Sequence, residues 1–226
     1  SALDKGGNDL IALEKAVEQA RVAYLTAART LSEARKQTAE KLDAAVKAEL
    51  PPLKLEKAVF KTQIDTLPES LWGADGLDKV VFTASTNTGT DAAPINKIAS
   101  GGELARFMLA LKVNLATSEN IPTLVFDEVD SAIGGATASA VGERLARLAR
   151  ENCQVLVITH SPQVASFGTH HFRVEKDDMD GKTVTNVREL TDSERREEIA
   201  RMLSGAEITD ASRAAAVELL KNRTHA

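Results

Sequence analysis

The feature that most constrains the fold is a long helical pattern near the start of the chain. Residues 10–49 contain neither glycine nor proline. Small or apolar residues recur there at alternating spacings of three and four, at Leu10, Leu13, Val17, Ala20, Tyr24, Ala27, Leu31, Ala34 and Thr38. This heptad seam predicts one long helix that pairs with a second helix in a coiled coil. At 1.5 Å per residue the helix would be roughly 60 Å long.

No other segment of the chain matches this helix in length, so its partner helix would come from outside the chain or from a second copy. Pro51 and Pro52 end the helix, because proline cannot continue the hydrogen-bond ladder. We therefore expect residues 1–50 to form a coiled-coil arm and residues 51–226 to form a lobe. Because the seam is narrow and rich in alanine, an amphipathic helix that lies on the lobe is the alternative.

A short apolar run, Thr123–Phe126, leads directly into two adjacent carboxylates, Asp127 and Glu128. Continuous apolar runs are typical of parallel strands covered on both faces, and ligands bind beyond the carboxyl ends of such strands. Side-chain alternation would aim the two carboxylates in opposite directions. One could hold hydrated Mg²⁺ while the other polarises an attacking water, as ATP hydrolysis requires. The alternative is a strand that ends in a solvated acidic turn.

A second apolar strand, Gln154–Thr159, follows a helix and ends at His160. A strand–helix–strand connection of this length predicts a parallel crossover, which would bring His160 to the sheet edge that carries Asp127 and Glu128. A lone histidine is usually structural, but at this edge it becomes a candidate for sensing a phosphate. The intervening helix carries Arg144, Arg147 and Arg150, which we expect on a solvated face, with a DNA-contacting patch as the alternative.

Two adjacent glycines open the helix that precedes the acidic strand, in the run Ser100-Gly101-Gly102-Glu103. Ser100 and Glu103 fit a capping box, which leaves the glycines unexplained, since each costs about 1 kcal/mol relative to alanine within a helix. Bare glycine N–H groups at the positive end of a helix suit a bound phosphate. We interpret the run as phosphate-binding.

The charge balance limits how the chain could meet nucleic acid. With 28 Lys and Arg against 33 Asp and Glu, its formal net charge is −5. Proteins that bind nucleic acid by bulk electrostatics are usually basic, so any DNA contact must come from local patches or from another part of an assembly. No apolar run approaches the roughly 20 residues that span a bilayer, and we expect no signal peptide. We expect no membrane partner and a cytoplasmic protein.

Taken together, these motifs resemble those of an ABC-type ATPase head of the SMC class. Residues 124–128 look like the Walker B strand with its catalytic glutamate, 100–103 like the signature motif, 130–134 like the D-loop and His160 like the switch histidine. Residues 85–89, 97–106, 159–165 and 199–205 are similar to the RecN-type family of bacterial double-strand-break repair ATPases. The resemblance covers roughly residues 50–222, and its motifs occur in the family's order.

The resemblance implies an α/β fold, the C-terminal lobe of an ABC/SMC-type ATPase head with a mostly parallel sheet flanked by helices, and an N-terminal coiled-coil helix. It implies ATP and Mg²⁺ as ligands, with Glu128 and His160 catalytic and Asp127 on the metal. The nucleotide-binding residues that it implies are Ser100, Gly101, Gly102, Glu103, Asp130, Ser131 and Gly134. In the family, the signature motif closes over ATP held by a second head, so that ATP binding dimerises heads and hydrolysis releases them.

The implied partners are an N-terminal lobe that carries the Walker A loop, a second head, a coiled-coil partner helix and DNA, at ends or double-strand breaks. The location would be the bacterial cytoplasm, at the nucleoid. Walker A itself, Gly-x-x-x-x-Gly-Lys-Ser/Thr, is absent from this sequence, so the chain alone should not hydrolyse ATP. The alternatives are a head lobe of another SMC, SbcC or RecF kind, and a non-catalytic coiled-coil module that binds a partner.

Overall fold

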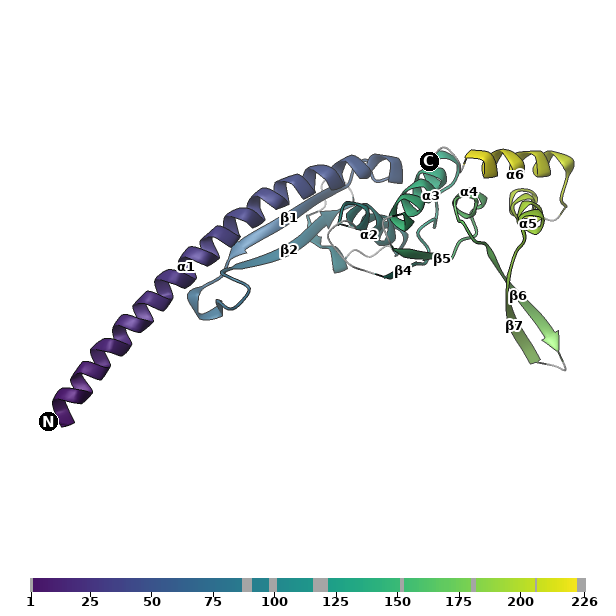
Figure 1. Cartoon of the computed structure of the whole chain (residues 1–226). Helices are drawn as coiled ribbons and strands as arrows, with labels where there is room; N and C mark the ends of the chain where they lie inside the picture. Colours follow the sequence, from purple (N-terminus) through teal and green to yellow (C-terminus); the bar gives the residue numbers. More distant parts are fainter. Residues whose placement is uncertain are drawn as a thin grey trace.

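The computed structural model describes residues 2–86, 91–97, 101–115, 122–150, 153–179, 182–205 and 207–222. In chain order its elements are α1 (Ala2–Glu49), η1 (Pro51–Leu53), β1 (Val59–Thr66), η2 (Glu69–Leu71), β2 (Asp78–Ser85), β3 (Ala93–Pro94), η3 (Ile95–Lys97), α2 (Gly101–Leu115), β4 (Thr123–Phe126), α3 (Gly135–Ala149), β5 (Gln154–Val157), α4 (Pro162–Ser166), β6 (Phe172–Met179), β7 (Lys182–Glu189), α5 (Asp192–Ser204) and α6 (Asp210–Asn222). The molecule is elongated, with the N-terminal part of α1 at one end and α5, α6 and the β6–β7 hairpin at the other (Figure 1).

Helix α1 ends at Glu49, as the prolines after it predict, and it lies along β1 and β2 (Figure 1). The face that it buries against the lobe includes Ala28, Ser32, Ala39 and Val46. The predicted seam runs beside this face and stays exposed, for example at Leu10, Leu13, Val17 and Leu31. Both expectations for the helix therefore hold in part: one stripe lies on the lobe, and the heptad seam remains accessible to a partner helix.

Polar contacts fix the arm on the antiparallel β1–β2 pair. The buried Asp78 carboxylate accepts a hydrogen bond from the Ser32 hydroxyl at 3.1 Å. Asp43 accepts one from the backbone N–H of Thr62 at 2.8 Å. Farther out, the Tyr24 hydroxyl donates to the Gly73 carbonyl at 3.1 Å. Because these contacts are spread over several turns of α1, they fix the arm relative to the β1–β2 pair.

Strands β4 and β5 pair in parallel, with Phe126 opposite Val157, which confirms the predicted crossover. The rest of the pairing among the described residues is antiparallel, in β1–β2–β3 and in β6–β7. Burial alternates along β4 and β5, so only one face packs on the core of α2 and α3. The other face leaves Val125 62%, Leu156 46% and Ile158 59% exposed. The expectation of two covered faces is wrong within this chain, because no described layer lies on the second face.

The base of the arm is joined to α3 by an ion-pair clamp, which we define as Glu49 with Arg144 and Arg147. Glu49 Oε2 lies 2.6 Å from Arg144 Nε, and Oε1 lies 2.9 Å from Arg147 Nη2. The Arg144 and Glu49 side chains are only 14% and 13% exposed. Burial alone would raise the pKa of Glu49, but the hydrogen bonds from the two arginines outweigh it and lower that pKa. The prediction of a solvated arginine face is therefore wrong for Arg144, which the arm covers.

The C-terminal part has its own small core, formed by Ile199, Ala200 and Ala216 of α5 and α6. Helix α5 begins with a complete capping box, in which Thr191 and Glu194 bond each other's backbone. The buried Arg195 guanidinium donates to the carbonyls of Ala165, Ser166 and Gly168, at the end of α4. This arginine ties α5 to the short helix that follows His160. Among the described residues, no helix is both long enough and apolar enough to cross a membrane.

Candidate functional site

The two carboxylates lie in a turn just beyond β4 rather than within the strand. Strand β4 ends at Phe126, and both Asp127 and Glu128 are exposed. Glu128 has a left-handed backbone with φ of 56°. This conformation is uncommon for a residue other than glycine and is frequent at functional sites. We expected side-chain alternation along a strand to set the directions of Asp127 and Glu128. Because both residues lie beyond the strand, the turn sets the direction of the Glu128 side chain instead.

The N-terminal end of α2 packs directly on this acidic turn. A Cβ atom placed on Gly101 would lie 3.2 Å from Glu128 Oε2, and one on Gly102 would lie 3.1 Å from Ser131 Cβ. The glycines thus allow close approach inside the chain, a use that the sequence pattern did not reveal. Glu103 is half-buried in the first turn of α2. Ser100, the remaining residue of the predicted signature motif, lies outside the described residues.

His160 lies at the same sheet edge as the carboxylates, because β4 and β5 are parallel and in register at Phe126 and Val157. Its side chain is 82% exposed, and its Nδ1 atom is 3.9 Å from Asp130 Oδ2. The predicted juxtaposition of His160 with Asp127 and Glu128 is therefore present. The arrangement offers an exposed imidazole and two exposed carboxylates to a ligand that binds at this edge.

The three predicted D-loop residues differ in their surroundings. Asp130 is 1% exposed and accepts hydrogen bonds from the Thr159 hydroxyl and from the Ser161 N–H, the latter at 3.2 Å. Ser131 is half-buried, and its carbonyl accepts from Arg106 Nη1 at 3.1 Å. Gly134 is exposed and immediately precedes α3. Of the three, Asp130 is turned into the protein.

Arg106 and Thr159 are the side chains at this site that the sequence motifs did not single out. Arg106 is only 5% exposed, although it stands in the first half of a helix that opens at the site. Burial lowers the pKa of its guanidinium, while the charge of Glu103 raises it. The sequence did contain a signal for Arg106: it is a charged residue among the apolar positions of α2, one helical turn after the glycines.

The acidic turn suits a magnesium ion that is bound together with a nucleotide. Among the residues that the structure describes, no group of three or more His, Cys, Asp or Glu side chains could hold a metal by itself. Magnesium commonly keeps several waters and binds through one or two carboxylates plus substrate phosphates. The exposed carboxylate of Asp127 meets that requirement. A stand-alone zinc or calcium centre does not fit the described part of the chain.

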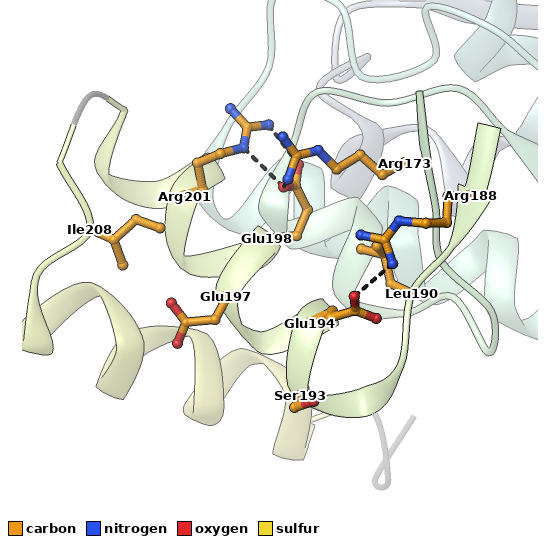
Figure 2. A pocket seen from close by; sticks show the side chains of 9 residues that line it. All are labelled: Arg173, Arg188, Leu190, Ser193, Glu194, Glu197, Glu198, Arg201 and Ile208. Carbon is orange, nitrogen blue, oxygen red and sulfur yellow. Dashed lines mark hydrogen bonds and ion pairs between the residues drawn. The ribbon is translucent and has the colours of Figure 1, made fainter. Parts of the chain in front are cut away.

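A separate hollow of about 280 Å³ lies between the β6–β7 hairpin and α5 (Figure 2). It is lined by Arg173, Arg188, Leu190, Ser193, Glu194, Glu197, Glu198, Arg201 and Ile208. Its arginines are paired with its glutamates, including Arg188 with Glu194 at 2.6 Å and Arg201 with Glu198 at 2.6 Å. Hydrogen bonds from Thr191 and Arg188 lower the pKa of Glu194 to about 2. These paired charges join the hairpin to α5.

Comparison with known proteins finds curated sequence relatives of this chain. The chain is 49% identical over 197 residues to the DNA repair protein RecN of Rickettsia conorii, covering 87% of this chain and 35% of that protein. It is 43% identical over 210 residues to the protein of the same name from Haemophilus influenzae, covering 92% of this chain and 37% of that protein. The chain therefore spans little more than a third of the length of these curated relatives. No protein-family model matches it.

Solved structures agree on the fold. The chain superposes on an Smc head domain with an extended coiled coil from Pyrococcus furiosus, with a TM-score of 0.54, 18% identity and coverage of 84% of this chain and 45% of that chain. It also superposes on an Smc head domain with a coiled coil and joint from Pyrococcus yayanosii, with a TM-score of 0.54, 18% identity and coverage of 87% and 36%. The expected α/β fold, an SMC-type head lobe with a long helix, is confirmed.

Proposed function

Since this chain belongs to the RecN family, over the third or so of the relatives' length that it covers, we propose that it is the C-terminal lobe of a DNA-repair ATPase head. The observation that carries the proposal is the meeting of three side chains at one sheet edge. Asp127, Glu128 and His160 all lie beyond the carboxyl ends of the parallel strands β4 and β5. ATP hydrolysis needs a metal-binding carboxylate, a base and a group that contacts the terminal phosphate in one place.

Each exposed residue at this edge has a proposed role. Asp127 would hold a magnesium ion, which would supply positive charge next to the phosphates. Glu128 accepts a proton from the attacking water as general base. His160 donates a hydrogen bond to the terminal phosphate through its exposed imidazole. Ser131 and Gly134, in the segment between β4 and α3, would contact the nucleotide.

We propose that the lobe does not hydrolyse ATP by itself, because the sequence carries no Walker A loop. We propose that an N-terminal lobe with that loop covers the bare face of β4 and β5. Val125, Leu156 and Ile158 are exposed there at the centre of the fold, and burying this apolar surface would favour association. Leu156→Glu should abolish binding of the purified N-terminal lobe to this chain. The same change at Val59, which is 57% exposed on β1, should leave binding intact, and equal effects of the two changes would refute the docking face.

Residues Ser100, Gly101, Gly102 and Glu103 are proposed to act in trans, on ATP held by a second head. Bare N–H groups and the helix dipole at the start of α2 favour a terminal phosphate. ATP would then join two heads, and hydrolysis would release them. Ser100→Arg should leave ATP affinity of a single reconstituted head nearly unchanged and block ATP-dependent dimerisation. If the variant still dimerised normally with ATP, measured as mass in solution, the proposed role of Ser100 in joining two heads would be refuted.

The remaining partners follow from the arm and from the family. The exposed seam of α1 would pair with a helix from the same protein, as the accessible Leu10, Leu13 and Val17 suggest. The reconstituted ATPase would act on DNA in recombinational repair of double-strand breaks, in the cytoplasm at the nucleoid. Because the chain is acidic overall, DNA would be bound by the assembled heads and arms rather than by this lobe alone.

Two substitutions separate the proposed roles of the carboxylates. In a reconstituted head, Glu128→Gln should keep Mg·ATP binding and lose turnover, because an amide cannot accept the water's proton. Asp127→Asn should weaken Mg·ATP binding, because it removes charge next to the metal. Nucleotide affinity measured by calorimetry, beside phosphate release, distinguishes the two. Equal loss of affinity in both variants would contradict the assignment.

A further inference from the structure

The Asp130 carboxylate joins the turn after β4 to the segment after β5. Its Oδ2 atom accepts the Thr159 hydroxyl and the Ser161 N–H. The Thr159 hydroxyl oxygen also accepts from the Ser161 N–H, at 2.9 Å. The three groups thus form a closed hydrogen-bonded triangle, which we call the Asp130 triangle. Charge-assisted hydrogen bonds of this kind are roughly twice as strong as neutral ones.

His160 lies between the two residues that the triangle holds. Thr159 precedes it and Ser161 follows it, and Ser161 is buried and caps α4 by accepting from the Val164 N–H at 3.4 Å. The His160 side chain is nevertheless 82% exposed. An exposed residue on a connecting segment ordinarily has a mobile backbone. Here the backbone is anchored on both sides while the imidazole is left accessible.

The same turn is held from its other side by α2. Arg106 Nη1 donates to the Ser131 carbonyl at 3.1 Å, from a side chain that is 5% exposed. Asp130 and Ser131 are neighbours in sequence, so one dipeptide is bound both to the glycine-led helix and to the His160 segment. Asp130 Oδ1 is buried with no hydrogen-bond partner among the described residues. Burying a carboxylate in this way is costly, which argues that its fixed position serves a purpose beyond packing.

We propose that Asp130 is a positioning residue, which acts through the Thr159 hydroxyl and the Ser161 N–H to fix His160 at the phosphate-facing edge, and that it does not contact the nucleotide. The inference rests on the proposed ATPase function and replaces the predicted role of Asp130 as a nucleotide ligand. It also explains why the buried Asp130 lies two residues after Glu128. Asp130 couples the ends of β4 and β5, whose flanking residues Glu128 and His160 must act together.

The first test needs no nucleotide. Amide hydrogen exchange of Ser161, followed by NMR on this chain, reports the triangle directly. We expect both Asp130→Asn and Thr159→Val to speed that exchange by about tenfold. Asp130→Asn removes the charge from one acceptor of the Ser161 N–H, and Thr159→Val removes the other acceptor. Thr159→Ser keeps the hydroxyl and should preserve protection. Thr123→Val is the matched control, because Thr123 bonds Gln154 at the opposite end of the same strand pair.

The second test uses the head reconstituted with its Walker A lobe. We expect Asp130→Asn and Thr159→Val to lower kcat about tenfold, with little change in the KM for ATP, because His160 is displaced while the nucleotide still binds. Thr159→Ser and Thr123→Val should retain turnover. A raised KM with unchanged Ser161 exchange would show that Asp130 contacts the nucleotide, and would overturn the proposal.

The two readouts separate this proposal from the ATPase assignment. If wild-type reconstituted heads show no turnover, the ATPase function fails, while the exchange result still decides whether the Asp130 triangle anchors His160. If Asp130→Asn does not fold, Thr159→Val decides, since it leaves the carboxylate in place. Unchanged Ser161 exchange in Thr159→Val would overturn the positioning role.

Discussion

Helix α3 passes so close to α4 that position 142 has no room for a side chain. A Cβ atom on Gly142 would lie 2.4 Å from Cδ2 of Phe167 and 3.1 Å from its Cγ. Alanine in a helix interior is favoured over glycine by about 1 kcal/mol, whereas forcing atoms into a packed core typically costs about 1–3 kcal/mol. We therefore predict that Gly142→Ala lowers the free energy of unfolding by about 1 kcal/mol, with the clash outweighing the gain in helix propensity.

Urea unfolding followed by circular dichroism measures this change, and a double-mutant cycle isolates its cause. Phe167→Ala removes the three atoms that would lie nearest to the new methyl group. In that background Gly142→Ala should stabilise the protein by about 1 kcal/mol, because only the propensity term remains. The sign of the effect should thus reverse between the two backgrounds. Stabilisation by Gly142→Ala in the presence of Phe167 would refute the predicted α3–α4 contact.

Three further outcomes follow from the ion pairs and the buried arginine. Glu49→Gln should lower the free energy of unfolding by about 1.5–3 kcal/mol in urea melts, since it weakens bonds to two charged partners. Arg147→Gln, at a half-exposed position, should lower it by under about 1 kcal/mol. Equal losses of stability in the two variants would contradict the ion-pair clamp. Arg195→Lys should lower the melting temperature, because an ammonium cannot donate to all the carbonyls that Arg195 reaches, and an unchanged melting temperature would be inconsistent with its tie to α4. The pKa of Glu194 is about 2 in the folded chain against 4.5 ordinarily, so its stabilising contribution is present above about pH 4.5 and is lost as pH falls towards 2. The urea midpoint of the wild-type chain should drop over that pH range, and that of Glu194→Gln should drop less steeply. Equal pH dependence of the two midpoints would contradict the lowered pKa of Glu194.

Local rules in the sequence predicted the elements of the fold well. The absence of glycine and proline over residues 10–49, followed by Pro51, defined the end of α1 at Glu49. Apolar runs located β4 and β5, and their connection predicted the parallel pairing. The start of α1 at Ala2 was missed, because Gly6 and Gly7 argue against helix locally. Short α4 was missed because five residues carry too little periodicity to recognise.

Features that depend on tertiary contacts were not predictable from those rules. The buried stripe of α1, at Ala28 and Ala39, is one residue away from the heptad seam, and alanines on both stripes conceal which one meets the lobe. Arg144 reads as a surface residue until Glu49 is known to lie over it. Asp130 lies two residues after Glu128, but a motif cannot say which acidic side chain turns inward. Each of these depends on a segment that is distant in sequence.

Steady-state ATP hydrolysis tests the central claim most directly. We predict no turnover by this chain alone, and magnesium-dependent turnover once the Walker A lobe is added. Glu128→Gln should abolish the turnover of the mixture, whereas Glu56→Gln, at an exposed position outside the site, should leave it unchanged. Turnover by the chain alone that Glu128→Gln abolishes, or turnover of the mixture that survives Glu128→Gln, would contradict the assignment of this lobe as one half of an ATPase site.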